Sequence, residues 1–107
     1  MNTEETADKD TGPVDLDTAR DMARSFKALS SPTRVRIISA LARGERNVND
    51  LAREVAMSQS AVSHQLRTLR RLRLVKNRRA GKRIYYSLDD RHIHDLFQEG
   101  LEHIAHG

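Results

Sequence analysis

The chain has 107 residues, enough for one domain with a modest core. Aromatic residues make up only 4% of it, and the absence of Cys excludes disulfides, thiolate metal sites and thiol redox chemistry. No apolar run approaches the length of a membrane span, and no signal peptide precedes the domain, so we expect a cytoplasmic protein without a membrane partner.

The net charge of +4 conceals a strong asymmetry along the chain. Residues 1–21 hold seven acids against two bases, whereas residues 55–88 hold nine Arg or Lys and no acid. A block of one sign inside a folded domain points to a polyanionic partner, and nucleic acid fits best. The alternative is a merely solvated surface, but such surfaces usually mix both signs.

The polar and acidic residues 1–14 are predicted to form a disordered tail, and residues 15–107 to form the folded domain. A first helix is expected from Asp15 or Asp17 to Leu29. One face of that helix is apolar and comprises Leu16, Ala19, Met22, Ala23, Phe26 and Leu29. Ser31 and Pro32 then suit the start of a second helix, which Gly44 would end.

The next two predicted helices form a helix-turn-helix. Asn47 suits the cap of a short helix with an apolar face, and a longer helix is expected from Ser58 to about Leu72. The exposed face of the longer helix carries an amide, hydroxyls and Arg, which are the groups that contact base edges and phosphates in a major groove. The predicted DNA-binding residues on this helix are Gln59, Ser60, Ser63, His64 and Arg67.

After Leu74 the apolar pattern changes from helical to alternating, which predicts two short strands, Val75–Arg78 and Arg83–Leu88, around Ala80-Gly81. A basic hairpin directly after a recognition helix is typical of a wing that grips DNA. The predicted DNA-binding residues of this wing are Arg78, Arg79, Lys82 and Arg83. A solvated hairpin is the alternative.

Four of the five histidines lie in the stretch Leu88–His106, which is predicted to be the last helix. His92 and His103 are eleven residues apart, so a helix would separate them by about 16 Å along its axis. Because metal–nitrogen bonds are about 2 Å long, no single ion can bridge that distance. Histidines that share a metal must therefore come from two chains. Asp90 can join His92 only if it precedes the regular helix.

Three segments resemble the ArsR/SmtB family of metal-sensing bacterial repressors: FKALSSPTRVRIISAL, LAREVAMSQSAVSHQLRTLRRLRLV and KRIYYSLDD. The resemblance covers the chain from about Ala19 onward. It implies a mainly α fold with a small β-hairpin, a winged helix-turn-helix of about five helices and a two-stranded wing, assembled as a homodimer. It also implies that the protein binds double-stranded operator DNA when metal-free and releases it on binding metal, which derepresses metal efflux or resistance genes.

The resemblance further implies a set of metal ligands. One branch of the family uses cysteines in the helix-turn-helix, and this chain has none. The zinc- and cobalt-responsive, CzrA-like branch uses Asp-x-His and, after ten intervening residues, His-x-x-His or His-x-x-Glu across the dimer interface. The matching residues are Asp90 and His92 of one chain with His103 and His106 of the other, while His94 is an extra. Zn(II) suits this set best, with Co(II) or Ni(II) as alternatives.

Two other interpretations stay open. The first keeps DNA binding but drops the metal, so that the histidines are incidental. The second is a metal-dependent hydrolase or nuclease, which we disfavour because four protein ligands leave no open position for a reacting water. We therefore expect a regulator and not an enzyme.

Overall fold

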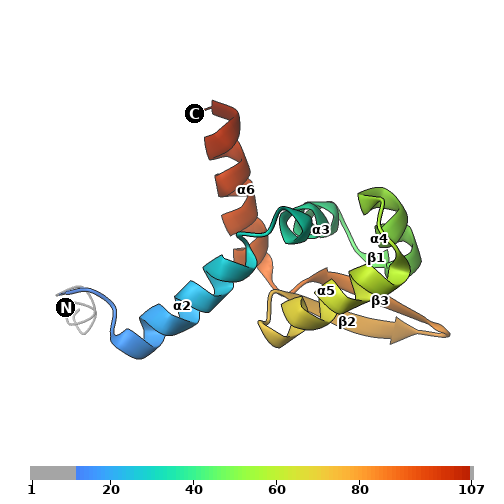
Figure 1. Ribbon diagram of the computed structural model, residues 1–107, viewed down its shortest axis with the longest axis horizontal. Coiled ribbons are helices and arrows are strands. Elements are labelled where there is room, and N and C mark those ends of the chain that lie inside the picture. Colours follow the sequence, from blue (N-terminus) through green and yellow to red (C-terminus); the bar gives the residue numbers. More distant parts are fainter. Residues whose placement is uncertain (1–11, 107) are drawn as a thin grey trace.

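Over residues 12–106, the chain forms five helices and one small antiparallel sheet (Figure 1). In chain order the elements are α2 (Leu16–Ala28), α3 (Pro32–Ala42), β1 (Arg46–Asn47), α4 (Val48–Val55), α5 (Gln59–Arg71), β2 (Val75–Ala80), β3 (Arg83–Leu88) and α6 (Arg91–His106). This computed structural model describes residues 12–106, and the side chains of residues 12–105. The tail predicted over residues 1–14 lies outside the described residues, apart from its last three.

Polar caps set the starts of the first four of these helices. In each case a side-chain oxygen accepts a hydrogen bond from the backbone N–H three residues later, which satisfies a donor that has no partner inside the helix. The capping residues are Asp15, Ser31, Asn47 and Ser58. Pro32 occupies the first turn of α3, where its missing N–H costs nothing. These starts agree with the sequence-based prediction to within two residues.

The sheet differs from the prediction in having three strands, in the order β1-β3-β2. Residues Arg46 and Asn47 pair with Tyr86 and Tyr85 of β3, which adds a third strand to the two-stranded wing. A two-residue strand is too short to show an alternating apolar and polar pattern, so no sequence pattern predicts β1. The hairpin itself is confirmed, and Gly81 takes a φ of 65° at its turn.

The start of α6 also differs from the predicted one. The helix begins at Arg91 and not at Leu88, because Leu88 is the last residue of β3 and pairs with Val75. Asp90 lies between strand and helix, and its Oδ1 accepts a hydrogen bond of 3.1 Å from the N–H of Ile93. Asp90 is therefore the cap of α6 and precedes the regular helix.

The core lies between α3, α4, α5 and the ends of the wing strands. Its fully buried side chains include Ile37 and Ile38 of α3, Leu51 of α4, and Val62, Leu66 and Leu69 of α5. These α5 positions are three and four residues apart, so they form one helix face, and the opposite face is left toward solvent.

Two helices carry apolar faces that this core does not cover. In Figure 1, α2 and α6 extend away from the compact part of the domain. Their large exposed apolar side chains are Leu16, Met22 and Phe26 on α2 and Leu96, Leu101 and Ile104 on α6. An apolar groove of about 390 Å³ runs along α6, lined by Leu29, Val35, Leu96, Phe97, Gly100, Leu101 and Ile104. Within residues 12–106, no helix has the length and apolar character needed to cross a membrane.

Replacing the cap of α4 tests this account of the fold. Asn47 is 6% exposed, and its Oδ1 accepts a hydrogen bond of 2.8 Å from the N–H of Asp50. Asn47→Ala leaves that donor without its partner and should lower the free energy of unfolding by about 1–2 kcal/mol. Urea unfolding followed by circular dichroism, at one fixed protein concentration, measures this change. Asn49→Ala, two residues later, removes only a solvent-exposed hydrogen bond to Gln59 and should change it by less than about 0.5 kcal/mol.

Candidate DNA interface and metal ligands

The exposed face of α5 presents the residues predicted to contact DNA. Gln59, Ser60, His64 and Arg67 are exposed, and Ser63 is half-buried. They occupy the side of α5 opposite Val62, Leu66 and Leu69, so burial of the apolar face fixes which side chains are offered to a ligand. Amide, hydroxyl and guanidinium groups on one exposed helix face suit base edges and phosphates.

Asn49 also lies at this surface, although it was not among the DNA-binding residues predicted from the sequence. Its Oδ1 accepts a hydrogen bond of 3.0 Å from Nε2 of Gln59, which joins the starts of α4 and α5. The bond orients the Gln59 amide at the end of α5 that carries the predicted contacts. An exposed Asn near a helix start has no distinctive pattern, and only the packing of the two helices reveals its partner.

A groove of about 350 Å³ separates the recognition helix α5 from the wing. It is lined by Asn47, Val48 and Asn49 at the start of α4, by Ser63 of α5, and by Lys82, Arg83, Ile84 and Tyr86 of the wing. Two predicted wing residues, Lys82 and Arg83, therefore meet a predicted α5 residue, Ser63, around one groove. Two cations beside a hydroxyl form a surface suited to a phosphate backbone.

Arg78 differs from the other predicted wing residues. Its Nε and Nη2 atoms donate hydrogen bonds of 2.8 and 2.7 Å to the two carboxylate oxygens of Glu45. The hydrogen bond from Arg78 lowers the pKa of Glu45 from its ordinary value, and the same bond raises the pKa of Arg78. Among the residues that the structure describes, no carboxylate forms an ion pair with Arg79, Lys82 or Arg83. The sequence offered no sign of this pair, because Glu45 and Arg78 are 33 residues apart.

Two of the four predicted metal ligands lie together at the start of α6. The Nδ1 atom of His92 is 3.7 Å from Oδ1 of Asp90, and the His92 side chain is 96% exposed. Neighbouring ligand atoms of a tetrahedral zinc site are about 3.3 Å apart, given bonds of about 2 Å. The spacing of this carboxylate and imidazole therefore fits two ligands of one ion, with open space for further ligands from outside the chain.

The remaining predicted ligands do not join this pair within one protomer. His103 is exposed on α6, eleven residues after His92 and so about 16 Å along the axis. His106 ends α6, and its side chain lies outside the described residues. In the described part of the chain, no three His, Cys, Asp or Glu side chains gather closely enough to hold a metal. His94 pairs instead with its neighbour Asp95, at 3.5 Å.

Comparison with known proteins places this chain in a family. The family model for bacterial regulatory proteins of the arsR family matches residues 31–77, from the cap of α3 into β2. A transcriptional repressor SmtB homolog of Synechocystis sp. is 53% identical over 91 residues, which cover 85% of this chain and 69% of that protein. The chain belongs to the ArsR/SmtB family. It is accordingly a DNA-binding transcriptional regulator and not an enzyme.

Two other members of the ArsR/SmtB family are informative. A cadmium resistance transcriptional regulatory protein CadC homolog of Staphylococcus aureus is 44% identical over 84 residues, which cover 78% of this chain and 69% of that protein. The homodimeric winged helix-turn-helix DNA-binding domain of a possible ArsR-family regulator from Mycobacterium bovis matches with a TM-score of 0.76 and 33% identity, over 91% of this chain and 95% of that one. The winged helix-turn-helix predicted from the sequence is thereby confirmed.

The salt dependence of DNA binding tests the groove. Log affinity falls linearly with log salt concentration, and each phosphate contact that is lost should make this negative slope shallower by about 0.9. A dimer carries two copies of each wing, so Lys82→Gln and Arg83→Gln should each make the slope shallower by about 1.8 in titrations of duplex DNA between about 50 and 200 mM salt. Arg20→Gln, on α2 outside the groove, removes the same charge and should leave the slope unchanged. Equal slopes in all three variants would contradict the assignment.

Proposed function

We propose that this protein is a homodimeric repressor that binds operator DNA when metal-free and releases it when Zn(II) binds between the last helices of the two subunits. The genes it controls would serve metal efflux or resistance. The observation that carries the proposal is the Asp90–His92 pair, a half-site at the start of α6 whose missing ligands lie too far along the same helix to complete it.

The exposed apolar face of α6 supports the dimer. Leu101 and Ile104 are 53% and 77% exposed in one protomer, and such a face is stabilised when a second chain covers it. If two α6 helices pair in antiparallel orientation, the start of one lies beside the end of the other. Asp90 and His92 of one subunit then meet His103 and His106 of its partner, and the dimer holds two equivalent sites.

The donor set favours Zn(II). One carboxylate and three imidazoles make four ligands of the kind that hold zinc tetrahedrally, and Co(II) accepts the same set. Ni(II) is the third metal to be tested. The CadC homolog is by its name a cadmium resistance transcriptional regulatory protein, which supports a role of this chain in metal resistance.

DNA would be contacted by two recognition helices and two wings. Gln59, Ser60, Ser63, His64 and Arg67 of each α5 would enter the major groove, with Arg79, Lys82 and Arg83 on flanking DNA. Metal would favour a dimer shape in which the two α5 helices no longer match the operator. Because such coupling is reciprocal, operator binding must weaken metal binding by the same factor. Operator DNA lies in the bacterial cytoplasm, which is the location we propose.

A regulator that does not sense metal is the second candidate. It is favoured by the hydrogen bond from the N–H of Ile93 to Asp90, which gives this carboxylate a role as the cap of α6 without a metal. A chelator distinguishes the two functions. For a sensor, adding a chelator to the zinc-loaded protein restores operator binding, whereas for the second candidate neither zinc nor chelator changes it.

Operator release with histidine variants tests the metal site directly. Titrating Zn(II), Co(II) or Ni(II) into the protein–operator complex should lower fluorescence anisotropy as DNA is released. His103→Gln should bind DNA normally but lose release, because it removes a ligand outside the DNA surface. His94→Gln, on the same helix and outside the ligand set, should be released like the wild type. Release should also weaken on acidification, since imidazoles must be neutral to coordinate. Unchanged release in His103→Gln contradicts the proposed site.

A charge on the apolar face of α6 tests the dimer. Ile104→Glu places a carboxylate where the partner subunit would pack, so the dissociation constant of the dimer should rise by at least about 100-fold. Sedimentation velocity over a range of protein concentrations measures it. Glu102→Gln, an exposed neighbour on α6, should leave the dimer intact. A dimer equally stable in both variants would place the interface elsewhere.

A further inference from the structure

We propose that Arg78 is a positioning residue that braces the base of the wing together with Glu45 and Tyr85, and that it does not itself contact DNA. The brace would hold β2 and β3 so that Lys82 and Arg83 stay over the groove beside α5. This inference rests on DNA binding by the domain and is independent of metal sensing.

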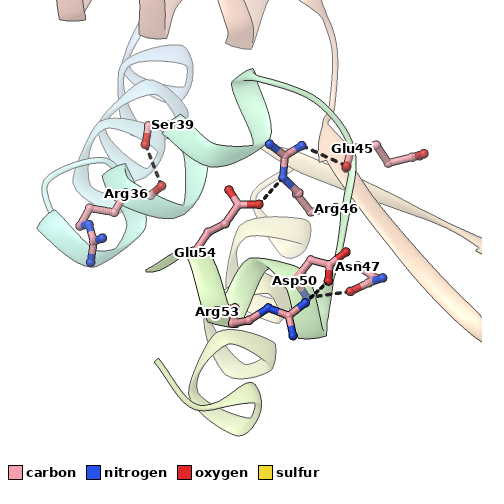
Figure 2. Close-up of polar contacts among 8 residues, drawn as sticks. All are labelled: Arg36, Ser39, Glu45, Arg46, Asn47, Asp50, Arg53 and Glu54. Atoms are coloured by element: carbon pink, nitrogen blue, oxygen red, sulfur yellow. Dashed lines mark hydrogen bonds and ion pairs between the residues drawn. The ribbon is translucent and has the colours of Figure 1, made fainter. Parts of the chain in front are cut away.

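The link between Arg78 and Glu45 has two parallel hydrogen bonds. The Nε–Oε2 and Nη2–Oε1 distances are 2.8 and 2.7 Å, so the planar guanidinium is held in one orientation. Glu45 directly precedes β1, and its carboxylate extends away from the Arg46 side chain, which pairs with Glu54 (Figure 2). One end of the brace is therefore anchored in the segment between α3 and the sheet.

Tyr85 of β3 also takes part in the brace. It lies directly opposite Arg78 in the β2–β3 register and opposite Asn47 in the β1–β3 register. The Arg78 guanidinium carbon is 5.1 Å from the centre of the Tyr85 ring, within the range of a cation–π contact. Arg78 of β2 thus contacts Tyr85 of β3 and Glu45, the residue before β1.

The brace lies on the side of the sheet away from the groove. Side chains alternate along a strand, and Ile84 and Tyr86 of β3 line the groove. Tyr85, between them, must point to the other side, and its cross-strand partner Arg78 shares that side. A hollow there is lined by Glu45, Lys76, Asn77, Arg78 and Ser87, a set that contains none of the groove residues.

Charge leads to the same conclusion. The Glu45 side chain is 34% exposed and already supplies both oxygens that a bidentate Arg accepts, so a phosphate would have to displace a bound carboxylate. Beside the larger effect of the Arg78 hydrogen bond, the charge of Lys76 also lowers the pKa of Glu45, which favours the charged carboxylate. Arg78 and Glu45 together add no net charge to the wing, whereas Lys82 and Arg83 remain available as cations.

Three variants separate a brace from a DNA contact. Arg78→Lys keeps the charge but cannot form the bidentate pair, Arg78→Gln removes the charge, and Glu45→Gln removes the other partner. A brace predicts that all three bind duplex DNA about two- to fivefold more weakly, which is the scale of one surface ion pair. It also predicts an unchanged salt slope for each. Hydrogen exchange of the β2–β3 amides in the DNA-free proteins should become faster in the same three variants.

A direct phosphate contact predicts a different set of results. Arg78→Lys would then bind like the wild type, and Arg78→Gln, which removes two contacts from the dimer, would make the salt slope shallower by about 1.8. Glu45→Gln would bind DNA more tightly because it frees Arg78. Any of these results overturns the brace. Arg79→Gln serves as the matched control, since the neighbouring Arg79 should show the shallower slope. Titrations at 25 °C on variants shown to be folded by circular dichroism exclude a general loss of structure.

Discussion

Burial of one face of α5 is the constraint on which the rest of the molecule depends. Val62, Leu66 and Leu69 are completely buried in the core, where α5 packs against α4 and β2, and each buried aliphatic side chain contributes about 1.5–3 kcal/mol. Because these residues recur at helical spacing, burying them leaves the opposite face of α5 toward solvent. The same packing brings the start of α4 beside the start of α5, where Asn49 meets Gln59. One face of α5 therefore contributes to the core, and its opposite face forms part of the proposed DNA-binding surface.

Local signals explain which parts of the fold the sequence could predict. Ser31, Asn47 and Ser58 act within three residues of their own positions, so their caps are visible in the chain. Strand β1 was missed because its two residues are strand only through pairing with β3. The pairing of Glu45 with Arg78 likewise depends on three-dimensional packing.

For the candidate site, what the sequence could predict depends on distance along the chain. Asp90 and His92 are two residues apart, and the strand that ends at Leu88 explains why Asp90 can precede the helix and lie near His92. The roles of His103 and His106 rest on a second chain, which no single protomer contains, and they stay a prediction. The spacing of the proposed ligands and the exposed apolar face of α6 both point to a partner subunit, although they arise from unrelated properties of the helix.

The connection between the wing and the last helix consists of two residues only. β3 ends at Leu88 and α6 begins at Arg91, and both residues between them are tied. The N–H of Asp89 donates to the carbonyl of Leu74 at 3.1 Å, and Asp90 caps α6. These hydrogen bonds prevent the two residues from acting as a flexible linker. A residue inserted between them would shift α6 relative to β3. The wing that we propose to contact DNA and the helix that carries the proposed metal ligands therefore have a fixed relative placement.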